Sequence, residues 1–182
     1  MRWLGGRGLG RELFDCYTQV ELNSLEAMEC PNRLSPRTRL RIGRFSEPGR
    51  TYLLTTTVQG REPLFRELAL GRLVIAELRA AHEQGWVSSL AWVVMPDHLH
   101  WLVRLEGHSL DTLMRRIKSN SARLINRRLG RPGPLWQGGY HDRALRRDED
   151  LRVAARYVVA NPLRAGLVER VGDYLLWDAI WV

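Results

Sequence analysis

Two histidines, His98 and His100, are the residues whose type and spacing most directly indicate chemistry. One residue separates them, and in a β-strand residues i and i+2 point to the same face, about 6.5–7 Å apart along the chain. Both imidazoles could therefore bind one metal ion while Leu99 faces the core. The same alternation is found in any half-exposed strand, so the pair alone leaves both interpretations open.

Tyr157 and Asn161 form a second pair. They are four residues apart in a segment expected to be helical, which places a phenol and an amide oxygen on one helical face. The two groups could therefore contribute to one site. The alternative is structural: Tyr157 is a core tyrosine with its hydroxyl at the edge, and Asn161 caps a helix that ends before Pro162.

The residue pattern predicts the elements that must position these side chains. In chain order they are a strand at 51–58, a helix from 63 to about 84, the two strands of a hairpin at 86–95 and 98–105, a helix from 109 to 129, a strand at 140–145 and a helix from 148 to about 160. This βαββαβ order predicts an α+β, ferredoxin-like antiparallel sheet with helices on one face, followed by an added C-terminal helix that carries Tyr157.

The charge distribution indicates a nucleic-acid ligand. Lys and Arg number 28 against 20 acidic residues, and residues 108–170 alone carry 14 basic and 6 acidic residues, which accounts for the whole net charge of +8. Residues on the polar side of the second helix could follow DNA phosphates, and aromatic residues could stack unpaired bases. The candidate residues for DNA binding are Arg116, Lys118, Arg123, Arg127 and Trp136, with Trp101 and Tyr140 as further stacking candidates. A solvated basic face is the alternative.

Composition excludes several other classes of protein. No window of 18 consecutive apolar residues occurs, and the first ten residues lack an apolar segment of secretory length, so we expect neither a membrane-spanning nor an exported protein. Cys16 and Cys30 lie outside any CxxC or Cys/His pattern, which argues against a disulfide scaffold or a structural zinc site and favours the cytoplasm.

Three segments closely resemble the REP-associated tyrosine transposases, which are single-tyrosine HUH nucleases related to insertion-sequence transposases. These segments are the run from Trp92 to Trp101 that contains His98-Leu99-His100, then Leu135-Trp136-Gln137, then the run from Ala155 to Val168 that contains Tyr157 and Asn161-Pro162. The resemblance spans about residues 37–181. Residues 36–182 are therefore expected to form one catalytic domain. Residues 1–35, which have no counterpart, are expected to form a poorly ordered appendage.

The resemblance implies the function and the roles of individual residues. His98, His100 and Asn161 would bind a divalent cation, Mg²⁺ or Mn²⁺, and Tyr157 would attack DNA to form a 5′-phosphotyrosine and release a 3′-hydroxyl. The substrate would be single-stranded DNA with extragenic palindromic repeats that fold into hairpins. The predicted protein is a cytoplasmic DNA endonuclease and strand transferase that serves DNA transposition or recombination, as a monomer, with a dimer left open.

Two alternatives remain. The first is a non-catalytic DNA-hairpin-binding protein on the same fold, which would have no reason to keep both histidines and Tyr157. The second is an RNA-binding ferredoxin-like domain, whose sheet should carry paired aromatic residues that the sequence does not show.

Overall fold

The most apolar runs of the sequence form the central hairpin in the computed structural model, which describes residues 46–146 and 150–181. Strands β2 (Val87–Met95) and β3 (His98–Leu105) are joined by a tight turn and pair antiparallel, with a register shift between Ser89 and Ala91. Both strands are almost entirely buried, as expected for a hairpin with helices on both faces.

Three further strands complete an antiparallel sheet of order β4-β1-β3-β2-β5. Strand β1 (Thr51–Thr57) pairs with β3, from Thr51 opposite Arg104 to Thr57 opposite His98. Strand β4 (His141–Ala144) pairs with the outer side of β1, and β5 (Trp177–Ala179) with the outer side of β2. The residues that begin β3 therefore lie in the middle of the sheet.

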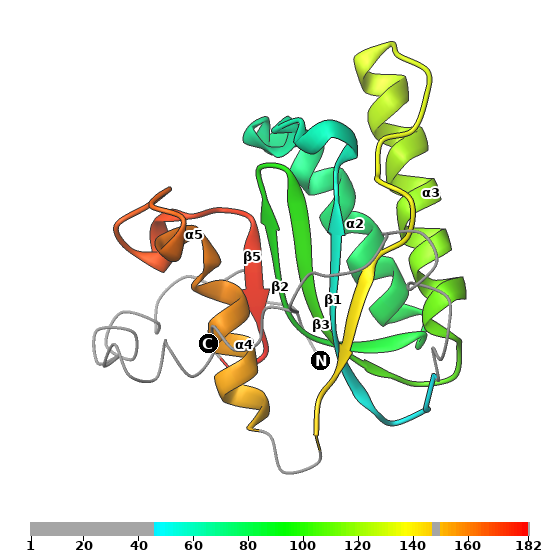
Figure 1. Ribbon diagram of the computed structural model, residues 1–182, viewed down its shortest axis with the longest axis vertical. Coiled ribbons are helices and arrows are strands. Elements are labelled where there is room, and N and C mark those ends of the chain that lie inside the picture. The colour runs from blue at the N-terminus through cyan, green and yellow to red at the C-terminus, as the bar shows by residue number, and fades with distance from the viewer. Residues whose placement is uncertain (1–45, 147–149, 182) are drawn as a thin grey trace, which may run out of the picture.

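Helices α2 (Leu68–Glu83) and α3 (Leu110–Leu129) cover one face of the sheet (Figure 1). Their apolar sides pack on the alternate residues of β3 that include Leu99, Trp101 and Val103. Ser109 caps α3 by accepting a hydrogen bond from the Thr112 amide, and Gly130 ends it with a left-handed backbone at φ 62°. Short 3₁₀ turns at Gln59–Arg61 and Leu64–Arg66 connect β1 to α2.

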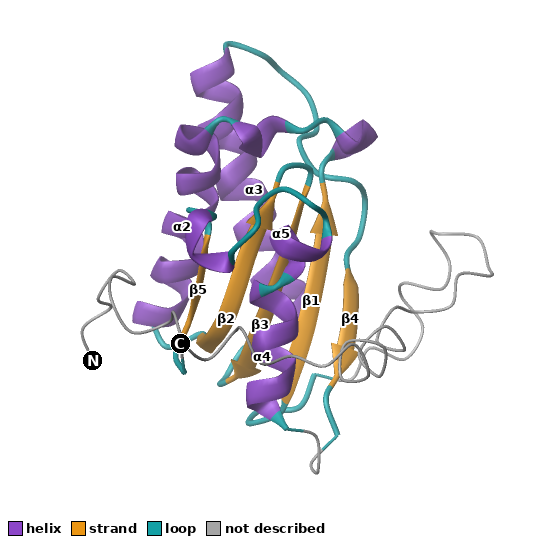
Figure 2. Cartoon of the chain, turned by 90° about the vertical axis from the view of Figure 1, so that its left-hand side faces the viewer, coloured by secondary structure: helices purple, strands orange, loops and turns teal. Residues whose placement is uncertain are grey.

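Helices α4 (Leu151–Val159) and α5 (Asn161–Arg164) cover the opposite face, as both views show (Figures 1 and 2). A second core cluster forms here between α4 and the sheet, and it includes Leu102 from β3. The Asp150 side chain caps α4 by accepting a hydrogen bond from the Arg152 amide. A 3₁₀ turn at Val171–Asp173 then leads to β5.

The predicted fold class and element order are confirmed, and three details differ. The first helix begins at Leu68 rather than Pro63, because Leu64–Arg66 forms a separate 3₁₀ turn. The third helix ends at Val159, close to the predicted end, but Asn161 and Pro162 then begin the short helix α5, which was not predicted. Proline is tolerated in a first helical turn. Strand β5 was not predicted.

The predicted appendage, residues 1–35, lies outside the described residues, as do residues 36–45 and 147–149. Within the described part of the chain, no helix has the length and apolar character needed to cross a bilayer.

Candidate active site

His98 and His100 lie at the start of β3, on the face that α4 and α5 cover. Their ring centroids are 4.8 Å apart and the ring planes meet at 87°. Leu99, between them, is buried in the core on the opposite face. The strand thus brings the two imidazoles together on one side and anchors itself through the residue between them.

Asp97 orients the ring of His98. Its carboxylate accepts a hydrogen bond of 2.5 Å from Nδ1 of His98, and the Arg61 guanidinium donates to the other carboxylate oxygen at 3.2 Å. Burial pushes the pKa of the Asp97 carboxyl upward, but the hydrogen bonds and positive charges of His98 and Arg61 outweigh it and hold this pKa below its usual value. Because Nδ1 of His98 is engaged by a carboxylate, Nε2 is the nitrogen left for a metal ion.

Thr55 orients the ring of His100 in a similar way. Its hydroxyl oxygen lies 2.9 Å from Nδ1 of His100, across the β1–β3 pairing that places the two residues opposite each other. Burial, followed by the positive charges of His98 and Arg164, lowers the pKa of His100 to about 3. His100 is therefore neutral at physiological pH, and the neutral imidazole is the form that binds metals.

Tyr157 and Asn161 come from the helical segment that packs over the same face. The Asn161 side-chain amide donates hydrogen bonds of 3.0 Å to the backbone carbonyls of Tyr157 and Val158, so its Oδ1 is the atom that could coordinate an ion. Tyr157 is 5% exposed. The neighbouring residues that anchor α4 to the sheet are Ala154, Ala155, Val158 and Val159.

Arg164 connects the helical segment to the histidines. Its guanidinium carbon lies 4.5 Å from the centroid of the Tyr157 ring, and its charge contributes to the lowered pKa of His100. Helix α4 contacts β3, and α5 contacts β2 beside it. The four residues predicted as catalytic or metal-binding therefore all belong to β3, α4 and α5, which lie on one face of the sheet.

The donor set suits a loosely held divalent cation. Two imidazole nitrogens and one amide oxygen would leave coordination positions for water or substrate. Within residues 46–146 and 150–181, no group of three or more His, Cys, Asp or Glu side chains could enclose a metal ion. The residues present therefore fit an open cation site better than a closed structural one.

The cationic candidates of α3 lie on the far face of the sheet from this cluster, because α3 packs against the other core. Arg116 donates to the Gln84 side chain at 2.6 Å and lies 4.4 Å from the centroid of the Trp86 ring. Lys118 donates to two backbone carbonyls, those of Gln137 and Gly139. Arg123 donates to Asn120, one turn earlier. The structure does not bring Arg116, Lys118, Arg123 and Arg127 to the histidines.

The structure does not support the prediction that Trp136 stacks on bases, because its ring is buried. Trp136 is 5% exposed, packs against Phe65, and donates its indole N–H to the Ser121 hydroxyl at 3.0 Å. Trp101 is fully buried, and Tyr140 is buried and donates its hydroxyl to Asp111. All three rings serve the core that supports α3, so none offers a free face to a DNA base.

Strand β4 adds two residues to the histidine face that the sequence did not reveal. His141 pairs opposite Thr55, and Arg143 opposite Leu53, and directly paired residues of an antiparallel sheet share a face. His141, Thr55 and His100 thus form one row across three strands. Because the pairing of the strands determines which residues form this row, the sequence pattern alone could not predict it.

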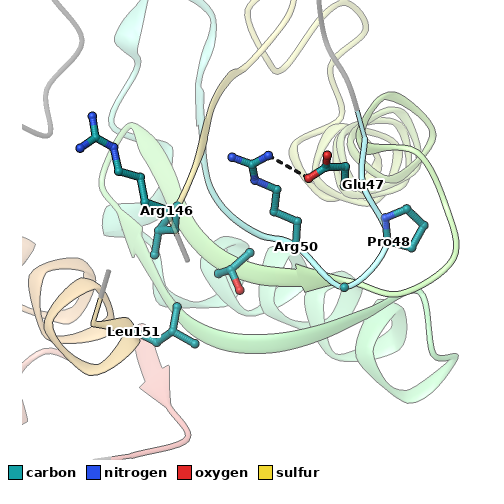
Figure 3. Close-up of a pocket in the computed structure, with 8 residues that line it drawn as sticks. Glu47, Pro48, Arg50, Arg146 and Leu151 are labelled. Atoms are coloured by element: carbon teal, nitrogen blue, oxygen red, sulfur yellow. Dashed lines mark hydrogen bonds and ion pairs between the residues drawn. The ribbon is translucent and has the colours of Figure 1, made fainter. Parts of the chain in front are cut away.

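A cavity of about 420 Å³ lies at the other end of β1. Glu47, Arg50, Arg146 and Leu151 contribute to its lining, and Arg50 donates to Glu47 at 2.8 Å (Figure 3). It adjoins Thr51, four residues and about 13 Å along the strand from Thr55. This cavity is therefore separate from the His98–His100 cluster.

With this fold and cluster in place, comparison with known proteins defines the class. The family described as "Transposase IS200 like" matches residues 51–161, a stretch from the start of β1 to Asn161 that contains both histidines and Tyr157. The chain belongs to this family of transposases.

Individual relatives fall within one group of these transposases. A REP-associated tyrosine transposase of Escherichia coli K12 is 23% identical over 133 residues, which cover 72% of this chain and 77% of the relative. A Haemophilus influenzae protein, provisionally named as another REP-associated tyrosine transposase, is 28% identical over 115 residues, 55% of this chain and 65% of the relative. A solved REP-associated tyrosine transposase, bound to a REP hairpin, superposes with a TM-score of 0.62 at 22% identity, covering 74% of this chain and 79% of that one. The resemblance in the sequence and the fold are both confirmed.

Proposed function

We propose that this transposase is a metal-dependent single-stranded DNA endonuclease and strand transferase, with Tyr157 as its nucleophile. The observation that carries the proposal is the convergence on one sheet face of two oriented imidazoles and a tyrosine whose ring lies under Arg164. A binding protein would need neither the Nδ1 partners of both histidines nor a tyrosine beside them.

The proposed reaction is a transesterification. The Tyr157 hydroxyl oxygen attacks the phosphorus of a phosphodiester and gives up its proton to water. The bond from phosphorus to the 3′ oxygen breaks, and this oxygen takes up a proton and leaves as a 3′-hydroxyl. The DNA on the other side stays attached as a 5′-phosphotyrosine, which preserves the phosphodiester energy so that a later 3′-hydroxyl can rejoin the strand.

His98, His100 and Asn161 would hold the cation through two Nε2 atoms and one Oδ1 atom. A bound Mg²⁺ or Mn²⁺ would act as a Lewis acid on a non-bridging phosphate oxygen. Imidazole ligands favour Mn²⁺ over Mg²⁺, so we expect Mn²⁺ to bind more tightly. The chain's own residues orient the ligands: Asp97 fixes His98, Thr55 fixes His100, and the carbonyls of Tyr157 and Val158 fix the Asn161 amide.

The proposed substrate is a single strand that carries a palindromic hairpin, acted on by a monomer in the cytoplasm. The solved relative bound to a REP hairpin supports this substrate, and the net charge of +8 supports a polyanionic ligand. A hairpin-binding protein without catalysis is the second candidate, and the solved complex is compatible with it as well.

Covalent trapping separates the two candidates. A pool of hairpin oligonucleotides with randomised single-stranded flanks and a 3′ label is incubated with the full chain in Mn²⁺ and run on denaturing gels. Label should migrate with the wild-type protein and not with Tyr157→Phe, which removes one oxygen and keeps the ring. Tyr140→Phe, which removes a hydroxyl on the other side of the sheet, is the matched control and should form the adduct. No adduct with any member of the pool would favour the binding protein.

A further inference from the structure

Arg164 is the last residue of α5 and lies directly over the candidate nucleophile. Its amide donates to the carbonyl of Ala160 at 3.0 Å, which closes the short helical turn after α4. This turn brings the guanidinium carbon to 4.5 Å from the Tyr157 ring centroid, in the range of a cation–π contact. Tyr157 itself is almost fully buried, whereas Arg164 is exposed. The arginine therefore lies between the tyrosine ring and solvent.

The charge of Arg164 is not neutralised within the described part of the chain. Among residues 46–146 and 150–181 it makes no ion pair, and the Asp97 carboxylate beside His98 is already bonded to His98 and Arg61. Its charge nevertheless reaches His100, whose pKa it helps to lower. The guanidinium, without an ion pair among these residues, therefore lies beside the Tyr157 ring, and its charge reaches His100.

A phosphodiester is the ligand that matches this arrangement. The guanidinium has five N–H donors in a planar fork that fits two oxygens of a phosphate, and it remains charged at any physiological pH. The side chains of His98, His100 and Asn161 carry no negative charge that would pair with it. A DNA phosphate at this site would fill the place that a carboxylate takes in an ordinary ion pair.

We propose that Arg164 is a further catalytic residue, which binds a non-bridging oxygen of the scissile phosphate while its guanidinium holds the Tyr157 ring in position. This inference rests on the proposed function of Tyr157. As the bond from the Tyr157 oxygen to phosphorus forms and the bond to the 3′ oxygen breaks, negative charge is shared by the non-bridging oxygens. Arg164 stabilises that charge through its N–H donors and transfers no proton.

The first test measures DNA binding without chemistry. In a Tyr157→Phe background with EDTA, affinity for the same randomised hairpin pool is measured over a range of salt concentrations. Losing one phosphate contact to a single strand should lower the slope of log K against log salt by about 0.7. Arg164→Gln should show this decrease. Arg170→Gln, which removes an exposed arginine already paired with Asp173, should leave the slope unchanged.

The second test measures single-turnover adduct formation with Tyr157 present. Arg164→Gln should slow it about 10²–10³-fold, the usual effect of removing one donor to a developing charge. Arg164→Lys keeps the charge without the planar fork, so it should keep the salt slope and still react at least about tenfold more slowly. If Arg164→Gln loses its cooperative thermal transition, the rate of adduct formation in Arg164→Lys is compared with that of the wild type instead.

The outcomes separate this inference from the proposed function. If the wild type forms no adduct, the role of Tyr157 is wrong, and the salt slope still decides whether Arg164 contacts phosphate. An unchanged slope in Arg164→Gln would overturn the phosphate contact even if the adduct forms slowly. A wild-type rate of adduct formation in Arg164→Gln would overturn the catalytic role.

Discussion

Removing the carboxylate of Asp97 should weaken metal binding without touching a metal ligand. The Asp97–His98 hydrogen bond is 2.5 Å long, and both side chains are only about one-fifth exposed, 19% and 21%. Loss of such a partner of a metal-binding histidine typically costs about 10–100-fold in affinity. This corresponds to about 1.4–2.7 kcal/mol of binding free energy. Asp97→Asn keeps an acceptor for Nδ1 without the charge and should lie between the wild type and Asp97→Ala.

The assay is a titration of Mn²⁺ into the DNA-free protein, followed by the electron paramagnetic resonance of free Mn²⁺. Arg61→Gln is the matched control, because it removes the other partner of Asp97 and leaves His98 in place. Arg61 is 71% exposed, and an exposed ion pair contributes about 0–1 kcal/mol, so this control should change the dissociation constant less than about fivefold. Equal affinity in Asp97→Ala and wild type would refute the role given to Asp97, as would an equal loss in Arg61→Gln.

Three further predictions concern the rest of the chain. Trp136→Phe should lower the free energy of unfolding, measured in urea, by about 1–2 kcal/mol, because the buried Ser121 hydroxyl loses its indole donor. The affinity for the hairpin should stay unchanged. A loss of affinity in a variant of unchanged stability would show that Trp136 belongs to the DNA interface. Tyr174→Phe should cost about 1 kcal/mol through the lost hydrogen bond to the Val94 carbonyl. Burial raises the pKa of Tyr174 from 10.0 to about 12, so the wild type should lose stability as pH rises from 10 through 12. The phenylalanine variant should lose less stability over this range. Parallel profiles of stability against pH for the two proteins would contradict the raised pKa of Tyr174. Deleting residues 1–35 should leave a soluble protein that still forms the covalent adduct, and a truncated chain without a cooperative thermal transition would place the domain boundary elsewhere.

Local residue patterns were sufficient to predict the elements that position the site. The β-branched run at 51–57, the hairpin turn at Pro96-Asp97 and the Ser109 and Gly130 helix ends are all short-range signals, and each lies where it was predicted. The pairing of His98 and His100 on one face also follows from strand alternation alone. These features depend on contacts within a few residues, so they can be predicted from a single sequence.

The parts that sequence reasoning missed depend on contacts between distant segments. The periodicity of α3 identifies its buried side but not which face of the sheet it covers, so the sequence could not show that its basic residues lie away from the histidines. Their binding of DNA stays a prediction. Thr55 and His141 join the site through strand pairing, which no local pattern encodes. Arg164 joins it through the short helix α5, which accommodates Pro162 in its first turn and which the sequence pattern did not predict.

Mass-spectrometric mapping of the trapped adduct tests most directly the claim that His98, His100 and Tyr157 form one catalytic centre. Wild-type protein is incubated with the hairpin pool in Mn²⁺, the DNA is trimmed with nuclease, and tryptic peptides are sequenced; His98→Ala and His100→Ala proteins are treated in parallel. The expected result is a nucleotide joined through phosphate to Tyr157 in the wild type and no modified peptide in either histidine variant or in EDTA. Modification of another residue, or of Tyr157 in either histidine variant or in EDTA, would contradict the account.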